Sequence, residues 1–387
     1  MKKGILIHSI LLTLLLTTIS SAWTPVKRLT WNSGISEWPA ITAREDSDEI
    51  HIFWADDYSG NFEIYHKTSP DRGNSWSAPQ RLTWTAGDSR YPDAKPDSTG
   101  NIYLTWVDES PGHKEIYFKG STDGTNWQGA KRITWTSGST DPFILTDNND
   151  HVYLFWQSLA NSGNEEIFYK KSTDNGSSWG LTQRITWTSD ASRSLCADMD
   201  SNNTIHILWQ DWSSSEFDIY YKKGALGGAS WSAPKRLTWA AETCMDPTVA
   251  IDSYNNIYTV FTKSAPAEEL YLKTSTDGGT SWGLLTRLTW NPGRSVRQHL
   301  NINQNDVLQV VWDDNSQGNC EIFYKWSTDS GLNWSVPSRL SWNSGDSIAS
   351  NIVSDKNSNL HLVWSDDTPG NSEIFYKSDI GTYPLKK

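Results

Sequence analysis

The sequence predicts an all-β fold, a seven-bladed β-propeller whose blades are four-stranded antiparallel sheets. Three observations predict it: a tetrapeptide that recurs seven times, strand patterns that recur in step with it, and a turn motif inside nearly every repeat. A period near fifty residues lies in the range of propeller blades. No segment keeps the 3.6-residue apolar period of an amphipathic helix, so the pattern excludes a helical fold.

The recurring tetrapeptide is Arg-Leu-Thr-Trp, with Ile for Leu in two copies and Ser for Thr in one. The intervals between copies are 53, 51, 52, 52, 51 and 52 residues. The copies stand at 28–31, 81–84, 132–135, 184–187, 236–239, 287–290 and 339–342. Such constant spacing indicates one structural unit repeated around a ring.

Between successive copies the chain shows a short apolar run and then two longer runs rich in β-branched and aromatic residues. Gly, Asn, Asp and Pro separate these runs, which is typical of strands joined by turns. The second strands are predicted at 51–54, 102–106, 151–156, 206–209, 257–261, 308–312 and 361–364. The third strands are predicted at 63–67, 115–119, 166–171, 218–223, 269–273, 321–325 and 373–377.

The seventh repeat has only three predicted strands and lacks the fourth. The first tetrapeptide, in contrast, stands at the beginning of the chain, before the first strand of the first repeat. We therefore expect residues 24–31 to supply the fourth strand of the last blade. Closure of the ring in this way removes the open sheet edge that would invite aggregation.

Tryptophan is the most unusual feature of the composition. Of 23 tryptophans, seven lie in the tetrapeptide, six end second strands and six lie in the turn motif. We predict that these recurring rings pack between blades. The acid that begins each third strand also recurs and is predicted to be structural: Glu63, Glu115, Glu166, Asp218, Glu269, Glu321 and Glu373.

Residues 1–22 have the pattern of a secretory signal peptide, with Lys2 and Lys3, an apolar run and the small residues Ser20, Ser21 and Ala22. We expect residues 23–387 to form a single propeller domain. The predicted location is the extracellular medium, the cell surface or the periplasm. No later stretch is long and apolar enough to cross a bilayer, so an integral membrane protein is not expected.

The charge and the cysteines exclude several classes of partner and scaffold. The net charge of −12 becomes −14 without Lys2 and Lys3, which does not suit nucleic acid or anionic lipid. Three cysteines, Cys196, Cys244 and Cys320, are too few for a disulfide framework, although Cys196 and Cys244 could pair. No cofactor motif is present, and we expect a monomer that binds a glycan or a cell-surface protein.

The link between third and fourth strands carries the turn motif Ser-x-Asp-x-Gly-x-x-Trp, seen at 69–76, 172–179, 275–282 and 327–334. Ser and Asp can bind nearby backbone amides, Gly accepts a positive φ and Trp can plug the turn. The motif resembles the Asp-box, or bacterial neuraminidase repeat, of the sialidase superfamily. The resemblance implies that these turns lie opposite an active site. The motif aspartates are therefore predicted to form turns: Asp71, Asp123, Asp174, Asp277 and Asp329.

The blades differ six to eight residues after each tetrapeptide Trp, where the innermost strand begins. These positions should ring the channel mouth, the usual place for a propeller ligand. Arg can bind a carboxylate and aromatic rings can stack on sugars, so an acidic sugar is the expected ligand. The alternative is a solvated rim whose charges simply vary. The candidate ligand-binding residues are Glu37, Trp38, Arg90, Tyr91, Asp141, Arg193, Asp246, Arg297 and His299.

Paired acids follow the second strand in four neighbouring blades, three of which we considered as calcium sites because Ca²⁺ prefers oxygen ligands. The candidates are Asp56, Asp57, Asp313, Asp314, Asp366 and Asp367. None of these loops has the ordered ligand spacing of a known calcium motif, and Asp-x-x-x-Gly is also a common turn.

The best-known members of the sialidase superfamily are exo-sialidases. The resemblance implies three arginines that grip the substrate carboxylate, a Tyr nucleophile activated by Glu and an Asp acid/base. In this chain the three arginines would be Arg90, Arg193 and Arg297. The catalytic candidates would be Tyr91, Glu37, Asp141 and Asp246. The sialidase motif Phe/Tyr-Arg-Ile-Pro is absent, however, and the repeat predicts seven blades where sialidases have six.

Short and uniform loops also argue against a deep hydrolase cleft. The leading hypothesis is therefore a secreted, non-catalytic binding module for glycans or a cell-surface protein. Repetition also permits several equivalent weak sites between blades, acting through avidity. An exo-α-sialidase or another glycoside hydrolase is one alternative, and a structural protein of an envelope or matrix is the other.

Overall fold

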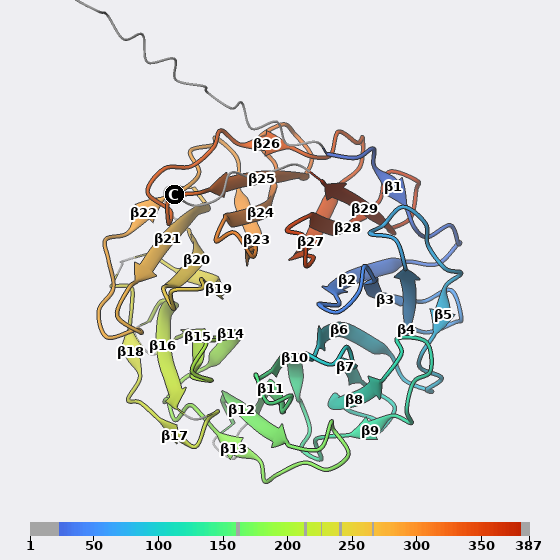
Figure 1. The fold of residues 1–387 in the computed structure, drawn as a ribbon, viewed down its shortest axis with the longest axis horizontal. Coiled ribbons are helices and arrows are strands. Elements are labelled where there is room, and N and C mark those ends of the chain that lie inside the picture. Colours follow the sequence, from blue (N-terminus) through green and yellow to red (C-terminus); the bar gives the residue numbers. More distant parts are fainter. Residues whose placement is uncertain are drawn as a thin grey trace, which may run out of the picture.

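The computed structural model describes residues 23–159, 163–212, 215–225, 227–239, 242–264 and 267–380. These residues form a ring of seven antiparallel sheets around a central channel, which confirms the predicted propeller (Figure 1). The predicted signal peptide, residues 1–22, lies outside the described residues. Among the residues described, none belongs to a helix that would reach across a membrane.

The first and second strands of each blade lie nearest the channel (Figure 1). The first strands are β2 (Ser36–Ala43), β6 (Ser89–Pro96), β10 (Thr140–Thr146), β14 (Ser192–Met199), β19 (Cys244–Ile251), β23 (Ser295–Ile302) and β27 (Ser347–Ser354). The second strands are β3 (Ile50–Asp56), β7 (Ile102–Asp108), β11 (Val152–Leu159), β15 (Ile205–Asp211), β20 (Ile257–Lys263), β24 (Leu308–Asp314) and β28 (Leu360–Asp366).

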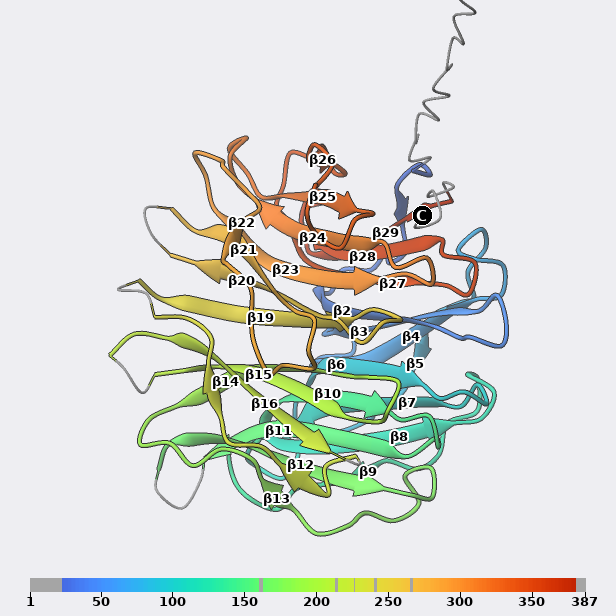
Figure 2. The same ribbon diagram turned by 60° about the vertical axis from the view of Figure 1, so that its left-hand side comes forward.

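The third and fourth strands form the outer part of each blade (Figure 1), and the rotated view shows β25 and β26 along the upper margin of the molecule (Figure 2). The third strands are β4 (Glu63–Ser69), β8 (Glu115–Ser121), β12 (Glu165–Ser172), β16 (Asp218–Ala225), β21 (Glu269–Ser275), β25 (Glu321–Ser327) and β29 (Glu373–Asp379). The fourth strands are β5 (Gln80–Arg81), β9 (Lys131–Arg132), β13 (Gln183–Arg184), β18 (Lys235–Arg236), β22 (Thr286–Arg287), β26 (Ser338–Arg339) and β1 (Lys27–Arg28). Blade four also carries β17 (Ser230–Trp231), which pairs with β16.

The N-terminal segment closes the ring, as predicted. β1 pairs with β29 in antiparallel register, Lys27 opposite Tyr376 and Arg28 opposite Phe375. The amide of Leu29 donates a 2.8 Å hydrogen bond to the carbonyl of Ile374. The last blade therefore combines three strands from the end of the chain with one from its beginning.

The tetrapeptide holds each fourth strand through its arginine and its threonine. Arg81 binds the buried carboxylate of Glu63 at 2.8 Å, and the amide of Ile64 donates to the hydroxyl of Thr83. The same two contacts recur in all seven blades. The recurring acid is therefore structural, as predicted, because it anchors the outer strand.

Two of the three tryptophan sets pack between blades as predicted. The second-strand rings are at most 2% exposed: Trp54, Trp106, Trp156, Trp209, Trp312 and Trp364. The turn-motif rings contact the preceding blade, as where Trp179 meets Phe118 edge to face at a centroid distance of 5.1 Å. Burial of these rings accounts for much of the apolar contact between sheets.

The prediction is wrong for the tetrapeptide tryptophans, which are 63–69% exposed. The fourth strand is only two residues long, so the Trp falls beyond its end and the adjoining blade leaves most of the ring uncovered. This set comprises Trp31, Trp84, Trp135, Trp187, Trp239, Trp290 and Trp342. We refer to it as the tryptophan belt.

The turn motif behaves as its residue types predict. The hydroxyl of Ser69 donates to Asp71 and accepts from the amide of Gly73, while Asp71 accepts from the amide of Ser75. The same pattern recurs around Asp174, Asp277 and Asp329. Asp123, in the turn that is one residue shorter, accepts from the amides of Thr125 and Asn126. These aspartates are turn-formers.

Candidate functional site

Every first strand carries a β-bulge close to its beginning, at the channel mouth. In β2 the antiparallel register shifts between Glu37 and Ala40, and the equivalent shift occurs in each of the other six blades. One non-glycine residue in each bulge has a φ between 48° and 55°: Trp38, Tyr91, Asp141, Ser194, Asp246, Arg297 and Ala349. Positive φ is uncommon outside glycine, and bulges redirect side chains next to binding sites. Five of these seven residues were candidates from sequence.

An open pocket of about 360 Å³ lies at this mouth. Its walls include Trp38, Tyr91, Asp141 and Arg297, which come from four different blades. The channel continues below as a cavity of about 480 Å³, lined by the first strands of all seven blades. The mouth is therefore asymmetric in chemistry although its backbone is sevenfold.

One side of the mouth is aromatic. The rings of Trp38 and Tyr91 lie 4.7 Å apart between centroids, and Trp38 also contacts Phe62 at 5.5 Å. The guanidinium of Arg90 lies over Phe62 at 4.3 Å and binds Asp88 at 2.6 Å. Burial raises the pKa of the Tyr91 hydroxyl above its ordinary value.

The other side of the mouth carries two carboxylates. Asp141 accepts a hydrogen bond from the side-chain amide of Gln157, and burial and then the charge of Glu165 raise its pKa. Burial also raises the pKa of Asp246, and Arg297 opposes this shift. The charge of Asp246 adds a smaller contribution to the upward shift of the pKa of Asp141.

Arg297 is held by Asp313, one of the paired acids considered as calcium ligands. Asp313 is fully buried, accepts from Arg297 at 3.3 Å and from the amide of Ala349 at 3.0 Å, and burial raises its pKa to about 7. Within the described part of the chain its Oδ1 atom has no hydrogen-bond partner. The guanidinium of Arg297 is half exposed and reaches the pocket.

The strand register distinguishes Asp313 from the other paired acids. Asp314, like Asp56 and Asp366, opposes the recurring acid of the third strand, whereas Asp313 opposes Ile322 one position earlier. In most blades Trp-x-Asp ends the second strand, so an acid directly after Trp312 is the exception. That spacing was the signal that could have separated Asp313 from the paired acids.

The remaining paired acids accept hydrogen bonds from the protein itself. Asp56 accepts from the hydroxyl of Ser36 and the indole of Trp54, and Asp314 and Asp366 are held by equivalent groups. Asp57 and Asp367 accept from backbone amides of the adjoining loop. Among described residues no three His, Cys, Asp or Glu side chains gather as metal ligands. The calcium prediction therefore has no supporting cluster.

The three candidate arginines do not converge. Arg90 is committed to Asp88, and Arg297 to Asp313. Arg193 binds Glu165 in a separate hollow of about 510 Å³ beside Trp212 and Phe217. Only Arg297 lines the mouth pocket.

Glu37 and His299 lie apart from the mouth pocket as well. Burial raises the pKa of Glu37, and the charge of Arg90 lowers it. His299 lines the deeper cavity, where burial and then the charge of Lys95 lower its pKa to about 4. The three cysteines are unpaired thiols, with Cys196 and Cys244 in one apolar cluster.

Solved structures share this architecture, whereas no protein-family model and no curated protein matches the sequence. An ulvan lyase aligns with a TM-score of 0.64 at 11% identity, over 90% of this chain and 95% of its own. A Hadza microbial sialidase aligns with a TM-score of 0.55 at 16% identity, over 85% and 76%. The intramolecular trans-sialidase of Ruminococcus gnavus aligns with a TM-score of 0.53 at 12% identity, over 93% and 98%. At these identities the likeness shows the fold alone: the chain is a seven-bladed β-propeller that resembles the propellers of these enzymes.

Proposed function

We propose that this protein is a secreted, non-catalytic module that binds a glycan in the channel mouth. The observation that carries the proposal is the ring of seven bulges, which presents an aromatic pair on one side of a single pocket and charged groups on the other. Positive φ at so many non-glycine positions persists where the surrounding structure holds it, and such positions cluster at ligand sites.

The chemistry of the pocket suits a sugar. The faces of Trp38 and Tyr91 offer stacking surface for the apolar face of a pyranose ring. Arg297 can bind a sugar carboxylate or hydroxyl, and Asp141 can accept from hydroxyl groups. The fold is shared with sialidases and an ulvan lyase, whose names indicate glycan substrates.

Two observations favour binding over hydrolysis. The dispersed arginines offer one guanidinium to the pocket rather than three. The raised pKa of Tyr91 also opposes a role as nucleophile, because an activated tyrosine needs a lowered pKa or an adjacent base. Glycoside hydrolysis is the second candidate, since Asp141 and Asp246 both have raised pKa values, as a general acid requires.

A glycan array tests the proposal, with the chain from residue 23 assayed in calcium and again in chelator. Selective binding of carboxylated glycans is expected, and Trp38→Ala should weaken it by about tenfold or more. The double variant Arg297→Ala, Asp313→Asn removes the guanidinium, and its second substitution avoids leaving the buried Asp313 carboxylate without its partner. Arg294→Ala is the matched control, because this equally exposed arginine binds Glu268 outside the pocket.

Three results would change the conclusion. A blank array in both conditions would overturn glycan binding and favour a protein ligand or a structural role. If the unsubstituted protein releases sugar from a bound glycan and the Asp141→Asn or Asp246→Asn variant does not, the result would favour a glycoside hydrolase. Binding that is lost in chelator would support the calcium hypothesis for the acidic loops.

A further inference from the structure

The tryptophan belt is a second feature that the mouth site leaves unexplained. A single exposed ring is ordinary on a protein surface, but seven large rings exposed by 63–69% at equivalent positions are not scattered. They follow the fourth strands, which lie outermost in the ring (Figure 1). Any ligand of the belt would therefore meet the outer wall rather than the channel.

Every belt ring has cations beside it. A lysine from the third strand of the next blade lies 5.2–5.9 Å from the ring centroid at all seven positions. The arginine of the same tetrapeptide lies 5.7–6.0 Å away at six of them. The same group of side chains is thus repeated around the wall.

These cations do not need the indole for their structural contacts. Lys170 donates to the backbone carbonyl of Ile133 at 2.9 Å, and Arg132 binds Glu115 at 2.9 Å. Each arginine is held through its Nη2 and Nε atoms, as where Arg132 Nε donates to the carbonyl of Thr134. The junction is therefore secured by polar contacts, and most of the Trp ring faces solvent.

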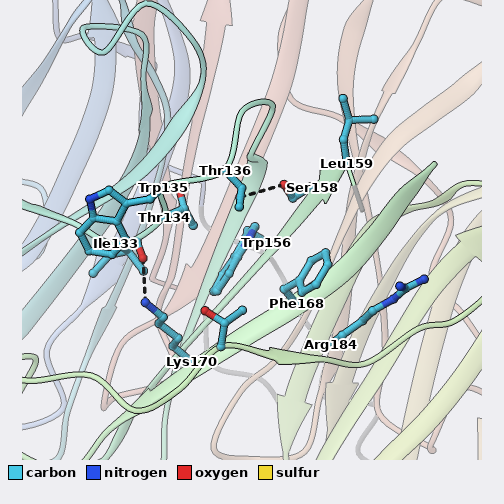
Figure 3. A pocket seen from close by; sticks show the side chains of 11 residues that line it. Ile133, Thr134, Trp135, Thr136, Trp156, Ser158, Leu159, Phe168, Lys170 and Arg184 are labelled. Atoms are coloured by element: carbon cyan, nitrogen blue, oxygen red, sulfur yellow. Dashed lines mark hydrogen bonds between the residues drawn. The ribbon is translucent and has the colours of Figure 1, made fainter. Parts of the chain in front are cut away.

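At Trp135 these groups line a hollow of about 400 Å³ between blades two and three (Figure 3). The exposed ring of Trp135 and the partly buried ring of Phe168 supply aromatic surface, with Trp156 buried behind them. Lys170 and Arg184 also line the hollow, and Thr136 and Ser158 add hydroxyl groups. Aromatic surface with a few convergent polar groups is the usual composition of a small-ligand site. Such a combination suits a sugar, because a pyranose ring has an apolar face that can stack on an aromatic ring and polar edges that can form hydrogen bonds.

The charged groups of the belt indicate whether its ligand is anionic or cationic. Five of the seven belt lysines are buried, and burial lowers the pKa of all seven, so the arginine is the cation that each repeat presents to solvent. The carboxylates are at most 1% exposed, whereas the arginines are 24–30% exposed. The solvent side of the belt is thus positive in a chain whose net charge is −12. Such a local reversal of charge attracts anions.

We propose that the tryptophan belt is a multivalent site for acidic polysaccharide, in which each exposed Trp stacks on one uronic acid unit and the partly exposed arginine of the same tetrapeptide binds its carboxylate. Seven weak and nearly equivalent sites suit a ligand displayed many times on a surface, because simultaneous engagement multiplies weak affinities. The proposal is independent of the mouth site, which lies on different residues.

Binding stoichiometry separates this proposal from the mouth site. Calorimetric titration of the chain from residue 23 with trigalacturonic acid should give about seven sites per chain, and rising NaCl should weaken them. The triple variant Trp84→Ala, Trp135→Ala, Trp187→Ala should lower the count to about four and reduce retention on immobilised polygalacturonate by tenfold or more. Trp38→Ala should change the count by one at most.

Two controls address folding and general stickiness. The triple variant with Phe in place of Ala keeps an aromatic face and should keep most of the retention. Tyr58→Ala removes a side chain that is equally exposed but lies outside the belt, and it should have no effect. A count of one or fewer sites, unchanged retention of the triple Ala variant, or equal binding of neutral cellotriose would overturn the proposal.

Discussion

Asp313 has an environment unlike that of its equivalents in the other blades. The corresponding positions hold uncharged residues: Ala55, Val107, Gln157, Gln210, Thr262 and Ser365. Asp313 places a carboxyl group against the guanidinium of Arg297 inside the protein, and burial raises its pKa to about 7 from an ordinary 3.8. The charge of this group, and with it the grip on Arg297, changes near neutral pH.

The first prediction concerns pH and stability. Between pH 4 and 7 the folded protein keeps a proton on Asp313 that the unfolded chain has released, so this group's contribution to the free energy of unfolding falls as pH rises. Asp313→Asn should therefore stabilise the protein by about 1–3 kcal/mol at pH 8 and by little at pH 4. Urea unfolding of both proteins across this range measures the difference. A difference that does not vary with pH would contradict the raised pKa.

The candidate site was only partly predictable at this scale. Trp38, Tyr91, Asp141, Asp246 and Arg297 stood out because they break a repeat, and asymmetry within a repeat can be read from one sequence. The sequence could not show that the three arginines point to different partners, because the direction of a long side chain depends on neighbours such as Asp88 and Glu165. The pKa values of Tyr91, Asp141 and Asp246 could not be predicted either, because they depend on burial by strands that are distant in the sequence.

At the scale of single elements, the turn between third and fourth strands shows why glycine recurs there. Gly73 has a φ of 83°, and a Cβ atom on it would lie 1.9 Å from the hydroxyl oxygen of Tyr376 in the preceding blade. The position thus requires both left-handed backbone and close approach between blades. Gly112 has a similar φ of 87° but no atom near its virtual Cβ.

The second prediction separates these two requirements. Gly112→Ala should cost about 1 kcal/mol, the strain of left-handed backbone alone. Gly73→Ala adds a clash with Tyr376 and should cost about 3 kcal/mol or more. Chemical denaturation of the two variants gives both values. Equal costs would mean that Tyr376 moves aside freely.

Most elements of the fold were predictable because the repeat supplies seven independent readings of the same pattern. Strand positions and the shared last blade follow from that repetition and from alternation of apolar residues. The tetrapeptide Trp was misjudged because recurrence indicates a common environment without indicating burial. Its exposure depends on the length of the fourth strand, two residues, which the sequence pattern left undefined.

At the scale of the whole molecule, the ring depends on contacts between its two ends. Arg28 binds the buried carboxylate of Glu373, and Leu29 is buried in the cluster that joins the last blade to the first. Removal of β1 takes away the guanidinium that pairs with Glu373 and leaves the edge of β29 unpaired. The mouth and the belt depend on this closure, because both are built from neighbouring blades.

The third prediction is that deletion of residues 1–31 opens the ring. Loss of a buried ion pair and a strand should lower the melting temperature by about 10 °C or more, and the free edge should promote self-association. A synthetic peptide of residues 23–31 added in trans should reverse both effects. Arg28→Ala alone should lower the melting temperature less. An unchanged, monomeric deletion variant would show that closure contributes little.

Closure by the first strand also means that β1 cannot pair until β29, near the end of the chain, has been synthesised. Arg28 must wait for Glu373, which is 345 positions later in the chain. At roughly 5–20 residues per second, a nascent chain carries an unpaired first segment for about 20–70 s before its counterpart is made. During that interval the incomplete ring exposes two groups that can associate with other chains: the unpaired N-terminal segment and the open face of the most recently made blade. We expect chaperones that bind these exposed surfaces to raise the yield of folded protein. Yield in cells should therefore respond to chaperone supply more strongly than the stability of the finished ring would suggest.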